Sequence, residues 1–173
     1  MESLKSQDLD KSIKILKNNM ITYHYDIAPP ITQEIYDFVQ KETPPAEWNE
    51  IKKNVHKDIK RLFEERDDIK YFYEKIDGLT FNAATIYGFS QFIDGELSWS
   101  NIYLMNFNTR DNEIFIDPDL KGNVILGEDS MSFFLYNTKN KTFEIIDKIA
   151  PGVLQTFNEF NGILQYIITT TEL

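Results

Sequence analysis

The chain has 173 residues, of which 42% are hydrophobic and 14% aromatic, and this composition predicts one folded globular domain, 1–173, and excludes a disordered chain. It contains no cysteine, which excludes disulfides, thiolate metal sites and a cysteine nucleophile. The net charge is −10, and residues 76–173 hold 13 acidic against 5 basic residues, so we expect no nucleic-acid and no membrane partner, whereas a basic protein would be attracted.

The N-terminal part, residues 1–66, is predicted to be helical. Its first residues, Met1-Glu-Ser-Leu-Lys5, lack the apolar core of a signal peptide, and no apolar run approaches the roughly 20 residues of a membrane span, so a cytoplasmic protein is expected. Thr32 can cap a short helix, and the pairs Pro29-Pro30 and Pro44-Pro45 interrupt the chain. Two longer helices are predicted from apolar residues at helical spacing, namely Leu9, Ile13, Leu16 and Met20, and then Trp48, Ile51, Val55, Ile59 and Leu62 in a helix beginning near Pro45.

The core part, residues 67–170, begins with a predicted helix, glycine corner and strand. Asp67 and Asp68 can accept hydrogen bonds from the first free N–H groups of the helix. Gly78 can adopt a positive φ angle and so end the helix in a left-handed turn. The β-branched and aromatic residues of 81–87 then predict one strand.

Residues 99–110 suit both a helix and a strand, and we favour the helix. Strands are expected at 123–127, 132–136, 142–147 and 153–157, followed by a closing helix around 160–167. Because strands so close in sequence pair as antiparallel neighbours, the predicted fold class is α+β, with N-terminal helices and a closing C-terminal helix packed on a mostly antiparallel sheet. We expect the helices to cover one sheet face and leave the other to a partner.

Catalytic signatures are missing from the sequence. It has no phosphate-binding loop, no nucleophile elbow and no His-Glu-x-x-His motif, and its two histidines form no motif. Asp111, Asp117 and Asp119 could hold a metal ion, and Glu128 with Asp129 could form an acid–base pair, as a small carboxylate- or metal-dependent hydrolase would require. Such pairs arise by chance among 28 acidic residues, so we expect no enzymatic activity and no cofactor.

The same region is a better candidate for a protein interface. Residues 94–129 hold eight acidic and two basic residues, a local net charge of −6, with aromatic residues between them. Aromatic anchors inside a charged rim are typical of protein–protein interfaces, although any single aromatic residue is more often part of a core. The candidate partner-binding residues are Asp94, Glu96, Trp99, Tyr103, Asp111, Asp117, Asp119, Glu128 and Asp129.

Several segments in order resemble the SUKH superfamily, and most closely its YrhA-like bacterial branch. They are Phe72-Tyr73, Ile76-Asp-Gly-Leu79, Phe81-Asn82, Ile86-Tyr-Gly88, Asn106 to Arg110, Gly127-Glu-Asp-Ser130, Phe133 to Asn137, and Phe157 to Leu164. The resemblance covers about residues 70–168. Asp77 stands where the family usually has Asn, and Ala83 where it often has Gly.

The resemblance implies an α+β immunity protein that binds and neutralises a cognate polymorphic toxin in bacteria. The matching residues look structural, so they imply the fold and no catalytic role. A basic toxin domain such as a nuclease would suit the acidic 94–129 region. A regulatory scaffold in cell-wall assembly would share the fold and differ in having an endogenous partner.

Overall fold

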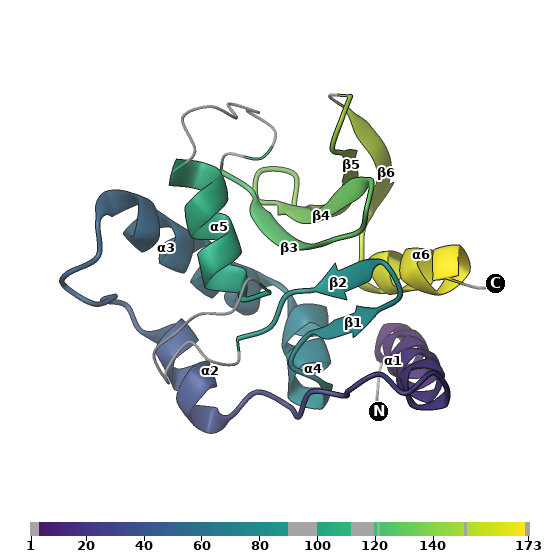
Figure 1. Cartoon of the computed structure of the whole chain (residues 1–173). Coiled ribbons are helices and arrows are strands. Elements are labelled where there is room, and N and C mark those ends of the chain that lie inside the picture. The colour runs from purple at the N-terminus through teal and green to yellow at the C-terminus, as the bar shows by residue number, and fades with distance from the viewer. Residues whose placement is uncertain (1–3, 90–99, 112–119, 121, 151, 172–173) are drawn as a thin grey trace.

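The computed structural model describes residues 4–89, 100–111, 120, 122–150 and 152–171, and Figure 1 shows its order of helices and strands. The N-terminal part, residues 1–66, holds α1 (Leu4–Thr22), α2 (Gln33–Gln40) and α3 (Glu50–Glu65), and the core part begins with α4 (Asp67–Lys75). Two short strands, β1 (Leu79–Phe81) and β2 (Ala84–Ile86), precede α5 (Ile102–Asp111). The chain continues with β3 (Val124–Glu128), β4 (Ser132–Asn137), β5 (Thr142–Asp147), β6 (Val153–Phe157) and α6 (Asn161–Thr171).

The six strands form one sheet in sequence order, β1-β2-β3-β4-β5-β6, and each neighbouring pair is antiparallel. Such a meander needs only short connections, because consecutive strands run in opposite directions. The predicted α+β class, with helices before the sheet and a closing helix after it, is therefore confirmed.

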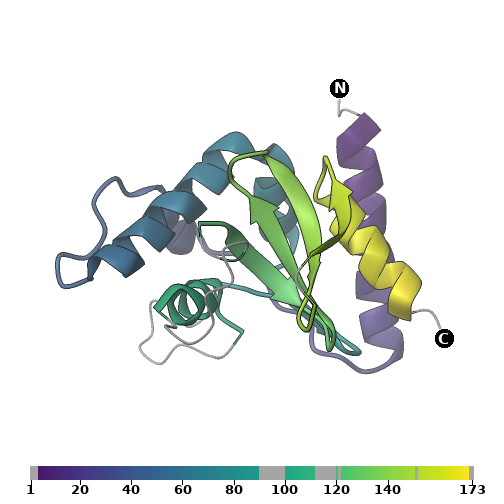
Figure 2. The ribbon, with the colours of Figure 1, turned by 90° about the horizontal axis from the view of Figure 1, so that it is seen from above.

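The helices gather in two groups on either side of the sheet. Figure 2 shows α1 and α6 side by side at one end of the molecule, with α3 and α5 at the other. α1 and α6 are joined by Ser12, whose hydroxyl lies 2.6 Å from Asn161 Oδ1 and accepts from Gln165 Nε2 at 2.7 Å. One continuous hydrophobic cluster among the described residues reaches from Leu9 in α1 to Ile168 in α6.

The centre of the sheet is buried on both faces. On one face, Phe134 and Phe143 contact Tyr166 and Phe160 of the closing helical segment, with ring centroids 5.8 and 5.6 Å apart. On the other face, Leu135 of β4 and its cross-strand partner Glu144 of β5 are only 0% and 6% exposed. The expectation of one open sheet face for a partner is therefore wrong in the middle of the sheet.

The segment predicted as one strand over 81–87 is a tight hairpin. Phe81 pairs directly with Ala84, and Asn82 between them has a φ of 54°. Asparagine tolerates this left-handed conformation better than most residues, because its short polar side chain can bond locally. Strand propensity predicted the extended conformation of this segment and missed the turn between Phe81 and Ala84.

The glycine corner lies beyond the end of α4. The helix ends at Lys75 with Ile76 in an extended conformation, and Gly78 follows with a φ of 74°. Here the chain before β1 runs alongside the end of β2, so closely that a Cβ on Gly78 would lie 2.6 Å from the Ile86 carbonyl oxygen. Asp77 stabilises this close approach, because its Oδ1 accepts a 2.6 Å hydrogen bond from the Phe89 N–H.

α5 replaces a missing strand partner of β3. β2 pairs only with Gly127 and Glu128, so within the described ranges no strand lies beside the start of β3 on that side. Asn106 of α5 takes that place: its Oδ1 accepts from Ile125 N at 2.8 Å, and its Nδ2 donates to Ile125 O at 2.9 Å. One turn later, Arg110 donates to Asn123 O at 3.0 Å and pairs with Asp58 of α3 at 2.7 Å.

Candidate functional site

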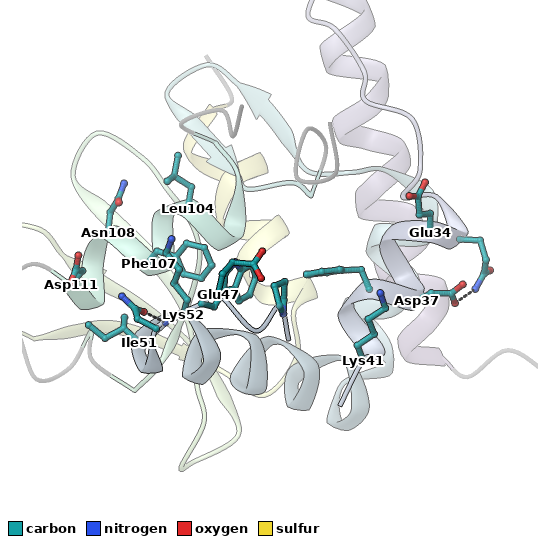
Figure 3. Close-up of a pocket in the computed structure, with 15 residues that line it drawn as sticks. Glu34, Asp37, Lys41, Glu47, Ile51, Lys52, Leu104, Phe107, Asn108 and Asp111 are labelled. Atoms are coloured by element: carbon teal, nitrogen blue, oxygen red, sulfur yellow. Dashed lines mark hydrogen bonds between the residues drawn. The ribbon is translucent and has the colours of Figure 1, made fainter. Parts of the chain in front are cut away.

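A cleft of about 1180 Å³ lies between α2, α3 and α5. Figure 3 shows Glu34, Asp37 and Lys41 on one side of it and the α5 residues Leu104, Phe107, Asn108 and Asp111 on the other. We call it the α2–α5 cleft. Its remaining lining residues are Gln33, Phe38, Pro45, Glu47, Trp48, Asn49, Ile51 and Lys52.

The N-terminal caps of α2 and α3 fix the two helices that the Pro44-Pro45 connection joins at the cleft. Thr32 caps α2 as predicted, with its hydroxyl accepting from Ile35 N. The third helix begins at Glu50, capped by Asn49 Oδ1, and not near Pro45 as predicted. Asparagine is among the strongest caps, and by starting the helix there it leaves Trp48 in the connection, where its ring forms part of the cleft wall.

The wall of the cleft is an aromatic cluster. The Trp48 ring meets Phe107 edge to face, with centroids 5.2 Å apart, and Phe38 at 6.0 Å. Tyr103 lies behind these rings, 5.8 Å from Phe38, and is fully buried. Edge-to-face contacts hold rings in defined orientations, so the wall has a fixed shape.

His56 ties the connection to α3 and α5 from inside. Its Nε2 donates to the Lys41 carbonyl oxygen at 2.8 Å, so in the neutral ring Nδ1 accepts from the Tyr103 hydroxyl at 3.1 Å. Burial lowers the pKa of His56 below its usual 6.5, with the Lys41 hydrogen bond acting in the opposite direction. The histidine is thus a structural support for the cleft.

This burial makes stability depend on pH. Because the pKa of folded His56 lies below 6.5, the unfolded chain binds more protons as pH falls under 6.5, and the free energy of unfolding decreases. The loss continues down to the folded pKa, with a slope of at most about 1.4 kcal/mol per pH unit. Urea unfolding between pH 7.5 and 5 should show it.

His56→Gln is the matched control, because glutamine keeps a donor and an acceptor but does not titrate. As pH decreases, the free energy of unfolding of the variant should fall less steeply than that of the unaltered protein, because the carboxylates titrate equally in both and only His56 differs. Parallel profiles would contradict the assignment of His56 as buried and neutral.

The rim of the cleft is acidic. Glu34, Asp37, Glu47 and Asp111 are exposed there, against two lysines, Lys41 and Lys52. Among the residues that the structure describes, none of these four carboxylates forms an ion pair, and Asp37 accepts a hydrogen bond from Gln33 Nε2 at 2.8 Å. A cationic group entering the cleft would therefore meet carboxylates without cationic partners there.

The structure separates the residues predicted to bind a partner. Asp111 lies on the cleft rim at the end of α5. Tyr103 is 0% exposed, so it supports the cleft from behind and does not itself reach a partner. Asp94, Glu96, Trp99, Asp117 and Asp119 lie outside the described residues.

Glu128 and Asp129 lie away from the cleft and are occupied by structural contacts. Glu128 pairs with Lys148 at 2.7 Å. Asp129 Oδ1 accepts from the backbone N–H groups of Met131 and Ser132, which closes the turn between β3 and β4. These contacts explain the residues as parts of the fold.

Sequence reasoning missed most of the cleft residues. Trp48 was assigned to the apolar face of a helix, and Glu34, Asp37 and Glu47 lie in the N-terminal half, far in sequence from the acidic 94–129 region. The only usable signal was Asn49, a strong cap that could have placed the start of α3 after Trp48.

Within the described part of the chain, no three His, Cys, Asp or Glu side chains gather as metal ligands would. The described helices also include none with the length and apolar character needed to span a membrane.

The chain is similar to the putative uncharacterized protein YrhA of Escherichia coli (strain K12). The two are 27% identical over 138 residues, which are 80% of this chain and 95% of the relative. No model of a known protein family matches the chain, and no solved structure matches it. The similarity agrees with the YrhA-like character of the sequence, and the relative's name states no activity.

Proposed function

We propose that this protein is an immunity protein of the SUKH superfamily that binds a cognate bacterial toxin domain and blocks it by direct contact. The observation that carries the proposal is the α2–α5 cleft, which combines an aromatic wall with exposed carboxylates that have no cationic partner among the described residues. This is the chemistry of a binding surface for a basic protein.

The charge distribution and the resemblance support the same proposal. The net charge of −10 would attract a basic toxin such as a nuclease and steer it during association. The ordered SUKH-like segments fall on structural features of the fold: Gly78 lies where the chain passes close beside the end of β2, and Asn106 and Arg110 bond the backbone at the start of β3. When the toxin is bound at the cleft, this protein would cover the toxin's anion-binding site and so exclude the toxin's substrate.

The partner is identified by capture from the native organism at physiological salt, followed by mass spectrometry. Recovery of a large toxin or its C-terminal domain, together with loss of toxicity in the presence of this protein, is the expected result. Recovery of wall-synthesis enzymes instead would favour a scaffold in cell-wall assembly and overturn the proposal.

Reversing three rim charges, as Glu34→Lys, Asp37→Lys and Glu47→Lys together, is expected to slow association with the captured toxin by roughly 10- to 100-fold at low salt. All three side chains are exposed, so the fold should be retained. Stopped-flow association rates at several salt concentrations measure both the rate and its salt dependence, which should also decrease.

A matched variant reverses three exposed acidic residues outside the cleft, Asp8, Asp26 and Glu74. It changes the net charge equally, so an effect of overall charge alone would appear in both variants. Equal slowing in the two would show that the cleft has no special part in binding.

A further inference from the structure

Cationic groups already lie over the aromatic wall of the α2–α5 cleft. Lys52 Nζ is 5.4 Å from the centre of the Phe107 ring, and Lys41 Nζ is 5.7 Å from the centre of the Phe38 ring. The face of an aromatic ring is electron-rich and attracts cations within about 6 Å. The two ring faces are thus positioned to bind a cation, with the protein's own lysines in place. Phe107 is only 6% exposed while Lys52 lies over its ring, so another cation reaches that face only when Lys52 moves aside.

Neither lysine is held there by a carboxylate. Within the described ranges, Lys41 and Lys52 form no ion pair, while neighbouring Lys53 pairs with Glu50 at 3.8 Å. Lysine is a flexible, strongly hydrated cation, so its contact with a ring at a solvent-exposed site is weak. Both lysines can therefore move aside at little cost.

The rim of the cleft also supplies carboxylates that could pair with a cation bound to the aromatic wall. Four carboxylates surround the wall against two lysines, a local net charge of −2. A guanidinium group is planar, stacks on aromatic rings and can bond a carboxylate through two parallel N–H groups. At about 1180 Å³, the cleft is also large enough for the chain segment that carries such a group.

We propose that the α2–α5 cleft binds an arginine side chain on an extended segment of the partner protein. The guanidinium replaces Lys52 over Phe107, next to Trp48, and pairs with a rim carboxylate such as Glu47 or Asp37. This inference rests on the proposed function only for the nature of the partner as a toxin. The recognition itself depends on the cleft alone.

The test uses the full chain and three blocked peptides that differ at one position: acetyl-Gly-Arg-Gly-amide, its lysine counterpart and its citrulline counterpart. Citrulline has nearly the shape of arginine and no charge. The readout is the indole N–H signal of Trp48 in ¹H–¹⁵N spectra, assigned with Trp99→Phe as the reference. The arginine peptide should cause a saturable shift with a Kd of roughly 1 to 10 mM, the lysine peptide should bind more weakly, and the citrulline peptide should bind at least about fivefold more weakly.

Two variants test the exchange with lysine. Lys52→Met should strengthen binding of the arginine peptide by roughly two- to fivefold, because it frees the Phe107 face and removes a repelling charge. Lys53→Met removes the same charge one residue away, outside the cleft lining, and should have a smaller effect. Asp37→Asn together with Glu47→Gln should weaken binding.

No saturable shift, or equal binding of the arginine and citrulline peptides, would overturn the inference. Equal effects of Lys52→Met and Lys53→Met would overturn the exchange at Phe107. If a toxin is captured but the arginine peptide does not bind to the cleft, the proposed function stands and this inference is overturned. If the arginine peptide binds but the captured partner is not a toxin, the arginine-binding inference stands and the proposed immunity function is overturned.

Discussion

Gly78→Ala is expected to lower the free energy of unfolding by about 3 to 5 kcal/mol, or to prevent folding. Gly78 has a φ of 74°, which costs a residue with a Cβ about 1 kcal/mol or more. The added methyl group would also lie 2.6 Å from the Ile86 carbonyl oxygen and 2.8 Å from the Gly88 nitrogen. Both are backbone atoms of the neighbouring strand β2 and the residues directly after it, so no side chain can rotate away to make room.

Gly122→Ala separates these two costs. Gly122 also has a positive φ, 88°, but among the described residues beyond its chain neighbours a Cβ there would meet no atom within 4 Å. Its substitution should therefore cost only the backbone strain, about 1 kcal/mol. Urea unfolding of both variants measures the two losses of unfolding free energy. Similar losses in the two variants would show that the backbone beside Gly78 can move apart without large cost.

Asn106→Leu is expected to lower the free energy of unfolding by about 3 kcal/mol, and the melting temperature by about 6 to 12 °C. Leucine has nearly the same size, so packing changes little. The substitution leaves both the N–H and the carbonyl of Ile125 without their side-chain partner, in a part of β3 where Ile125 is 1% exposed. A buried backbone group without a hydrogen bond costs about 1 to 3 kcal/mol.

Asn108→Leu is the control for this prediction. Asn108 lies two residues further along α5 and is exposed, so the same change of residue type there should alter stability by less than about 0.5 kcal/mol. Calorimetry of the two variants measures the difference. A loss below about 1 kcal/mol in Asn106→Leu would mean that water replaces the asparagine at the edge of β3.

The sequence alone determined those parts of the structure that depend on neighbouring residues. Apolar spacing predicted α1, Thr32 predicted the start of α2, and the pair Asp67-Asp68 predicted the start of α4. The polar loop 137–141 joins β4 and β5 as a hairpin, because antiparallel strands close in sequence have few other ways to pair. The positive φ of Gly78 was also predictable, since glycine adopts it without steric cost.

Only the tertiary structure decided which side chains meet. Phe38 and Phe107 are separated by 69 positions, yet Trp48 contacts both, because α2 and α5 pack on the two sides of the connection before α3. Sequence periodicity can show that a residue is apolar and on one face of a helix, but core and cleft wall have the same pattern. Tyr103 was expected at an interface and is buried, whereas Trp48 was expected in a helix and lines the cleft. The difference arises from long-range packing, which local propensity does not encode.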